Sequence, residues 1–221
     1  MRDLKELTFH PNVTYIIGEN GTGKSTLLEG IAIALGFNPE GGSRHYNFSN
    51  YHSHSDLHDF LTVTKGTRQM KDHYFFRAET FYNVATNIEE MDQEPTIGAK
   101  IIEGYGGISL HEQSHGEAFL AAFMNRFRGN GIYILDEPEA ALSPIRQMSM
   151  LSRIHDLVHK GAQFIISTHS PIVMAYEDAK MVELTEDGMH ETHLEETQHF
   201  KVMEQFFTNK QRMLYHLFHG D

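Results

Sequence analysis

The chain has 221 residues, of which 40% are hydrophobic, so it is long enough to form one domain with a full core. No apolar run approaches the roughly 20 residues that span a bilayer, and no secretory signal follows Met1, so we expect a cytoplasmic protein that does not insert into a membrane. The absence of Cys excludes thiolate chemistry, and the net charge of −12 argues against a surface that grips nucleic acid over its whole extent.

The first predicted unit is a strand, a glycine-rich loop and a helix. Residues 13–17 form a short apolar run, "GENGTGKS" matches the phosphate-binding pattern G-x-x-x-x-G-K-[ST], and residues 26–35 indicate a helix that ends at Gly36. We expect Lys24 to reach the β- and γ-phosphates, Ser25 to hold Mg²⁺ and Thr26 to contact the α-phosphate. The predicted nucleotide-binding residues are Gly18, Glu19, Asn20, Gly21, Thr22, Gly23, Lys24, Ser25 and Thr26.

Two polar segments follow this unit. "HYNFSNYHSHSDLH" contains four histidines, but their spacing does not match a zinc pattern, so a polar surface segment is favoured over a metal site. These histidines are His45, His52, His54 and His58. The densest basic stretch, "KGTRQMK" at residues 65–71, is interpreted as a solvated loop, although the net charge does not exclude a local groove for nucleic acid.

A helix is predicted from Ser114 in "LHEQSHGEAFLAAF". Ser114 and Glu117 have the spacing of a capping box, in which the two side chains satisfy free amides of the first turn. Apolar residues then recur at helical spacing on one face. They are Ala118, Phe119, Ala122, Phe123 and Phe127.

Two later strands end in chemically active residues. Residues 132–135 form an apolar strand that leads into Asp136 and Glu137, and residues 164–167 form another that leads to His169. Because ligands gather at the carboxyl ends of parallel strands, we expect Asp136 to support Mg²⁺ and Glu137 to activate a water molecule. A solvated turn is the alternative interpretation of the two carboxylates, and a structural role is the alternative for His169.

Helices and a hairpin complete the chain. Ser143-Pro144 and Ser170-Pro171 each have the composition of a helix start, and Asp187-Gly188 predicts a hairpin turn. Residues 200–218 indicate one or two amphipathic helices, for which packing on the domain core is favoured over a partner or dimer surface.

The motifs in this order resemble those of ATP-binding-cassette (ABC) ATPases, in particular the small stand-alone bacterial group described as predicted AAA-type ATPases. "GENGTGKST" corresponds to the Walker A loop, "IYILDEP" to the Walker B strand, "AALSP" to the D-loop, "STHSP" to the switch-histidine segment and "SHGE" to the signature. "FFRAETFYNVAT" is also typical of that group. His115 and Glu117 depart from the usual Ser-Gly-Gly-Gln signature.

The resemblance implies an α/β fold: a P-loop NTPase of ABC type with a mainly parallel sheet flanked by helices and a small helical subdomain. We expect a single domain over residues 1–221, with the signature lobe near 80–128 and the hairpin and helices at 181–221. Glu79 stands where the family carries a Gln that reaches the metal. Phe9 or His10 is the candidate to stack on adenine, because only about a dozen residues precede the first strand.

The resemblance also implies Mg²⁺-dependent ATP hydrolysis by a homodimer that holds ATP at its interface. Lys24, Glu137 and His169 are the candidate catalytic residues, Ser25, Asp136 and Glu79 the candidate metal ligands, and Ser114 and Gly116 the partner's contribution to the nucleotide site. DNA maintenance, defence or stress, with a soluble protein partner, is the favoured role. The alternatives are a transporter's nucleotide-binding subunit and an ATP-switched binding module, and Glu137 argues against the module.

Overall fold

The computed structural model describes residues 6–43, 55–93 and 98–220. Within them a seven-stranded sheet has the order β2-β3-β4-β5-β1-β6-β7. Its strands are β1 (Val13–Gly18), β2 (Gly42–Ser43), β3 (Asp72–Arg77), β4 (Gly131–Asp136), β5 (Gln163–Ser167), β6 (Ala179–Thr185) and β7 (Gly188–Thr192). The strands from β3 to β6 pair in parallel, and β2 and β7 pair antiparallel at the two edges.

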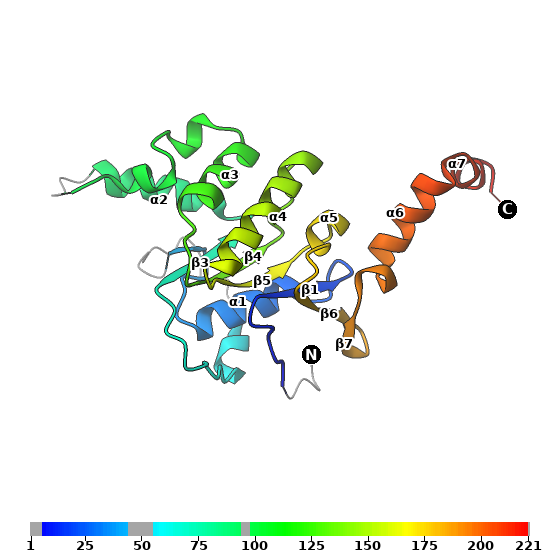
Figure 1. Ribbon diagram of the computed structural model, residues 1–221, viewed down its shortest axis with the longest axis horizontal. Helices are drawn as coiled ribbons and strands as arrows, with labels where there is room; N and C mark the ends of the chain where they lie inside the picture. Colours follow the sequence, from blue (N-terminus) through cyan, green and yellow to red (C-terminus); the bar gives the residue numbers. More distant parts are fainter. Residues whose placement is uncertain (1–5, 44–54, 94–97, 221) are drawn as a thin grey trace.

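Helices cover both faces of this sheet (Figure 1). The α-helices are α1 (Lys24–Ala34), α2 (Phe81–Gln93), α3 (His115–Asn125), α4 (Pro144–His159), α5 (Pro171–Met174), α6 (Gln198–Thr208) and α7 (Lys210–His219). Short 3₁₀ turns are η1 (Asp56–Phe60), η2 (Ile101–Tyr105), η3 (Leu110–Glu112) and η4 (Leu194–Glu196). The arrangement confirms the predicted α/β fold with a mainly parallel sheet.

The strands alternate their side chains between two apolar cores, as the period of a strand requires. Ile16 and Ile134 pack with α1 on one face, whereas Tyr15 and Leu135 belong to the larger core on the other face. In that larger core α3 contributes the predicted apolar face, and Phe127 stacks on Tyr133 with ring centroids 4.4 Å apart. All five residues of the predicted apolar face are buried, and Phe127 lies just beyond the end of α3.

The register of the parallel strands aligns the residues at their carboxyl ends. Arg77 lies opposite Asp136, and Asp136 lies opposite Ser167, so β3, β4 and β5 end in one row. The glycine-rich loop leaves the neighbouring β1 at the same edge, because Ile16 is opposite Ser167. The topology thus places the predicted phosphate loop beside the predicted acidic strand end.

The C-terminal segment differs in part from its prediction. The hairpin is confirmed, with β6 and β7 on either side of the expected turn. The prediction that the amphipathic helices pack on the domain core is wrong. No residue of α6 or α7 is buried, and Phe207, Leu217 and Phe218 are more than 70% exposed. Figure 1 shows the two helices projecting from the hairpin away from the sheet. The amphipathic pattern was present, but the apolar face lacks a partner within the described chain.

The structure also bears on the predicted absence of membrane spans, on the histidine-rich segment and on the basic stretch. Among the described residues, no helix has both the length and the apolar character that crossing a bilayer demands. His45, His52 and His54 lie outside the described residues, whereas His58 belongs to η1. The basic stretch at 65–71 is mostly exposed and lacks regular structure, as expected of a loop. No group of three or more metal-ligating side chains occurs in the described ranges.

The aromatic core under α3 generates a stability prediction. Phe123 is fully buried, while Met124, the next residue of the same helix, is 43% exposed. Phe123→Ala should lower the free energy of unfolding by about 3–5 kcal/mol, because it removes apolar contacts and leaves a cavity. Denaturant unfolding measures this change, with Met124→Ala as the matched control. Equal losses for the two variants would contradict the assigned core.

Candidate nucleotide-binding site

The glycine-rich loop closes around its own lysine. Gly18, Gly21 and Gly23 have φ values of 143°, 84° and 93°, a region that residues with a Cβ rarely adopt. The Lys24 ammonium is buried and donates to the carbonyl oxygens of Gly18 at 2.9 Å and of Glu19 at 2.8 Å. Burial lowers the pKa of Lys24, while the carboxylates of Glu137 and Asp136 act in the opposite direction. The loop therefore presents a desolvated cation at the N-terminus of α1.

A buried carboxylate lies beside this loop at the end of β4. Asp136 Oδ1 accepts hydrogen bonds from the hydroxyls of Ser25 at 3.2 Å and of Ser167 at 2.5 Å. Burial raises the pKa of Asp136, whereas both hydroxyls and Arg77 favour its ionised form. The structure thus brings together Ser25 and Asp136, two of the three predicted metal ligands. Hydroxyl and carboxylate oxygens are donors that Mg²⁺ prefers.

Arg77 ends β3, the strand next to β4, and lies opposite Asp136. Its Nη1 donates to Glu29 of α1 at 2.6 Å, and its Nε lies 3.9 Å from Asp136 Oδ2. The buried Nε atom makes no hydrogen bond with the described residues. This guanidinium therefore joins α1, β3 and β4 beneath the site.

Glu79, the third predicted metal ligand, pairs with the same arginine as Asp136. Its side chain is 85% exposed, and its ion-pair partner is Arg77 Nη2 at 3.9 Å. Within the described ranges, the hydrogen bonds of Ser25 and Asp136 do not include Glu79. A metal-binding role for Glu79 stays a prediction.

Glu137 and His169 face one another above the strand ends. Glu137 has a φ of 50°, an uncommon conformation for a residue with a side chain, and its amide donates to the carbonyl oxygen of Ser167 at 3.1 Å. Its side chain is 42% exposed, and its Oε1 lies 3.5 Å from His169 Nε2. Burial lowers the pKa of His169, with a further contribution from Lys24. Glu139 anchors the histidine by accepting its backbone N–H at 2.7 Å.

The signature segment lies at the start of α3, and the hydrogen bonds described for its serine stay within that region of the chain. Ser114 is exposed and forms the predicted capping box with Glu117, whose Oε2 accepts the Ser114 amide at 3.1 Å and the Ser114 hydroxyl at 2.6 Å. Arg146 of α4 donates to the same carboxylate. The helix α3 packs against α4 and η2, and the hydrogen bonds described for Ser114 do not reach the phosphate loop. A Cβ on Gly116 would approach the carbonyl oxygen of Ala141 to 2.3 Å, so this glycine permits close packing on the D-loop segment.

The two candidates for stacking on adenine have other contacts. Phe9 is partly buried and packs against the core around α1. His10 accepts a hydrogen bond from the Asn12 amide through Nδ1 and lies 3.7 Å from Asp178. Base stacking by either residue stays a prediction.

Sequence reasoning missed four residues that hold the site. Ser167 ends a predicted strand next to Asp136, so its position could have been found from strand order. Arg77 also ends a strand, and Glu139 follows the paired carboxylates by two residues. His199 had no such signal, because it lies just before the predicted amphipathic helices and 30 residues from its partner, His169.

Comparisons with known proteins show which families the chain is similar to. A family model described as "AAA domain" matches residues 2–107, and another, described as "AAA domain, putative AbiEii toxin, Type IV TA system", matches residues 75–175. "Putative ABC transporter ATP-binding protein TTE0246" from Caldanaerobacter subterraneus subsp. tengcongensis is 26% identical over 80% of this chain and 78% of its own length.

Two further relatives are larger proteins. "Retron Vc95 probable ATPase" from Vibrio cholerae serotype O1 biovar El Tor is 25% identical over 46% of this chain, and "ABC transporter G family member STR2" from Medicago truncatula is 26% identical over 72%. The chain spans 24% of the length of each.

Solved structures show the same fold. The dimeric structure of the ATP-binding cassette MJ0796 bound to ADP and Pi has a TM-score of 0.50 and 18% identity, covering 85% of this chain and 88% of that one. A second dimeric structure of MJ0796 has a TM-score of 0.51, 17% identity and the same coverage. The fold is therefore that of a P-loop NTPase of the ABC cassette type. The AAA-domain matches, the similarity to the ABC transporter ATP-binding protein and the shared cassette fold all support the predicted resemblance to ABC-type/AAA ATPases.

The glycines of the loop provide a matched test of its geometry. A Cβ on Gly18 would lie 2.4 Å from the carbonyl oxygen of Leu184, whereas a Cβ on Gly21 would meet nothing within 4 Å. Both positions have positive φ, so Gly18→Ala should destabilise by about 1–3 kcal/mol more than Gly21→Ala, the excess arising from the clash. Thermal and denaturant unfolding without nucleotide measure the difference. Equal stabilities would refute the close approach of β1 to β6 at this point.

Proposed function

We propose that the chain hydrolyses ATP with Mg²⁺ in a sandwich of two copies. Each triphosphate is held between the phosphate loop of one copy and the Ser114 helix of the other. The observation that carries the proposal is that the phosphate-binding residues and the signature serine lie on different parts of the same chain. Lys24, Asp136 and Glu137 share one sheet edge, whereas the exposed Ser114 belongs to a helix that packs elsewhere. A second copy supplies the opposite side of the site.

Lys24 is the principal phosphate ligand in this proposal. Two of the three N–H donors of its ammonium bond to carbonyl oxygens of the loop, which leaves the third for an anion. Backbone amides of the loop and the N-terminus of α1 add donors around the phosphates. The same geometry suits the triphosphate of a nucleotide, and the preference for adenine follows from the family.

Ser25 and Asp136 are the residues that would hold Mg²⁺. The fit rests on their two oxygens, which lie 3.2 Å apart beside the phosphate loop, and on the burial of the Asp136 carboxylate. When bound, Mg²⁺ supplies positive charge to the β- and γ-phosphate oxygens. Ser167 and Arg77 favour the ionised form of Asp136 against the effect of burial, and the Ser167 hydroxyl holds its Oδ1 in position.

Glu137 is the proposed general base. Its half-exposed carboxylate is within reach of water and accepts the proton as the water oxygen attacks the γ-phosphorus. The bond from that phosphorus to the β–γ bridging oxygen breaks, which gives ADP and inorganic phosphate. His169 donates a hydrogen bond from Nε2–H to the γ-phosphate, and Ser114 and Gly116 of the second copy complete the shell of donors. Closure of the dimer on ATP and its opening after hydrolysis would convert the reaction into motion.

The work driven by this reaction has two candidates. Similarity to the retron ATPase over 46% of the chain favours the first, a soluble ATPase in DNA maintenance, defence or stress. Similarity to the ABC transporter ATP-binding protein over 80% of the chain favours the second, a nucleotide-binding subunit of a membrane transporter. Purification of the tagged chain from its cells separates them: a membrane-spanning partner supports the transporter, and nucleic acid or a soluble partner supports the first role.

The general base yields a prediction about assembly. Glu137→Gln keeps the shape of the side chain but cannot accept a proton, so the variant should accumulate an ATP-bound dimer. Light scattering in saturating ATP and Mg²⁺ should give twice the monomer mass, and ADP should not support this dimer. The double variant Lys24→Ala/Glu137→Gln is the control and should stay monomeric, because it cannot bind the phosphates. A Glu137→Gln protein that is monomeric in ATP and Mg²⁺ would count against the sandwich.

The signature serine yields a prediction that separates binding from hydrolysis. Ser114→Arg should leave the Kd for ATP within about threefold but reduce kcat at least about 100-fold, because it removes a donor to the transition state and crowds the interface. Calorimetry and phosphate release measure the two effects. Ser149→Arg, at an exposed position of α4, is the matched control and should keep full activity. Full hydrolysis by Ser114→Arg would refute the role of Ser114.

A further inference from the structure

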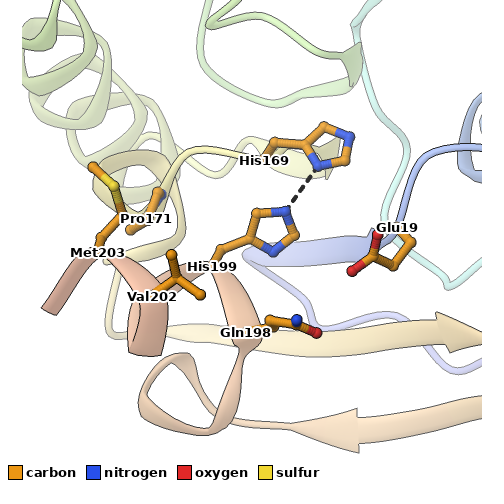
Figure 2. A pocket seen from close by; sticks show the side chains of 7 residues that line it. All are labelled: Glu19, His169, Pro171, Gln198, His199, Val202 and Met203. Atoms are coloured by element: carbon orange, nitrogen blue, oxygen red, sulfur yellow. Dashed lines mark hydrogen bonds between the residues drawn. The ribbon is translucent and has the colours of Figure 1, made fainter. Parts of the chain in front are cut away.

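A second histidine lies behind the proposed γ-phosphate contact. His169 Nδ1 and His199 Nε2 are 3.0 Å apart, and Figure 2 shows the two rings facing each other at one wall of a pocket that Glu19 also lines. His199 is the second residue of α6 and His169 follows β5, so this hydrogen bond joins the C-terminal helices to the nucleotide site. None of the motifs in the sequence accounts for His199.

The position of His199 is set by the start of α6. The N-cap residue Thr197 is fully buried, its hydroxyl donates to the carbonyl oxygen of Leu194 at 2.7 Å, and it accepts the amide of Phe200 at 3.2 Å. This cap fixes the first turn, which carries the His199 ring to His169. The positive end of the helix dipole opposes protonation of a histidine in that turn, and burial lowers the pKa of both rings. Burial therefore favours the neutral form of both rings.

A neutral pair shares one hydrogen, and its surroundings decide which ring donates it. If His169 donated through Nδ1, its Nε2 would present a lone pair to the Glu137 carboxylate 3.5 Å away, which is repulsive. If His199 donates through Nε2, His169 carries its hydrogen on Nε2 and directs it toward Glu137. His199 Nδ1, a buried atom without a hydrogen-bond partner among the described residues, is then the unprotonated nitrogen. The second arrangement removes the repulsion.

We propose that His199 is a positioning residue that donates its Nε2–H to His169 Nδ1 and so holds His169 in the tautomer that can donate to the γ-phosphate. The tautomer of one imidazole nitrogen is commonly set by the hydrogen bond of the other. The catalytic consequence rests on the proposed function, whereas the tautomer itself is a property of the chain without nucleotide.

The kinetic test uses two substitutions with different hydrogen-bonding capacity. His199→Phe keeps an aromatic ring without a donor and should lower kcat for ATP about tenfold, with KM within about twofold. His199→Gln can still donate through its amide and should recover most of the loss. His193→Phe, at an exposed position six residues earlier, is the matched control and should behave as the parent protein.

A double-mutant cycle shows whether His199 acts through His169. In a His169→Ala background, His199→Phe should cause no further loss of kcat, because the group it positions is gone. Multiplication of the two effects, or equal activities of His199→Phe and the parent protein, would overturn the proposal.

A measurement without nucleotide keeps the inference separate from the ATPase proposal. Nitrogen-15 NMR of the histidine-labelled full chain at pH 7.5, with signals assigned from the His169→Ala and His199→Phe variants, reports the tautomer of each ring. His169 should carry its hydrogen on Nε2, and His199→Phe should let both tautomers appear. A parent protein with the His169 hydrogen on Nδ1 would refute the inference even if ATP is hydrolysed. A parent protein that lacks ATPase activity but has the expected tautomer would refute only the proposed function.

Discussion

The hydrogen bonds to Asp136 are the interaction on which the rest of the site depends. A carboxylate buried at a strand end is costly unless its oxygens are satisfied, and here Ser25 and Ser167 donate to the same oxygen. These bonds connect α1, β4 and β5 at one point, while Arg77 connects β3 to the same carboxylate. The phosphate loop and the strand ends therefore have a fixed relation before any nucleotide binds.

This fixed half of the site contrasts with the parts that face solvent. Glu137 is held by its backbone in an uncommon conformation, so its carboxylate projects from the strand end with 42% of the side chain exposed. Ser114 starts a helix at an exposed position, and its own amide is held by Glu117 in the capping box. One chain thus offers a phosphate-binding face and a separate donor-bearing face, an arrangement that suits two copies related by symmetry.

Much of this organisation could be predicted from the sequence, and the reasons are local. Each of these signals depends only on residues that are close together in the sequence. They are the glycine spacing around Lys24, the apolar run before Asp136 and the capping residues Ser114 and Ser143. The strand register, which places Ser167 and Arg77 beside Asp136, depends on contacts between distant segments and was not foreseen. The pair of His169 and His199 depends on where α6 starts in space, which periodicity does not reveal.

The C-terminal helices were predicted from the sequence, but their packing was not. Their amphipathic pattern predicted the helices but not where the apolar face would lie, because a hydrophobic stripe specifies burial and not the partner. Phe207 and Phe218 are exposed within the chain, yet His199 at the start of the same pair of helices contacts the switch histidine. The C-terminal segment is therefore linked to the nucleotide site through the place where α6 begins, which the composition of the segment does not reveal.

The central claim is that each site is built from two chains, and a mixing experiment tests it most directly. Neither Lys24→Ala, which lacks the phosphate ligand, nor Ser114→Arg, which lacks the donor helix, should hydrolyse ATP alone. In a mixed dimer the Ser114→Arg chain provides an intact phosphate loop and the Lys24→Ala chain an intact signature, so steady-state phosphate release should reappear on mixing. A mixture as inactive as its components, in dimers shown to exchange subunits, would contradict the composite site.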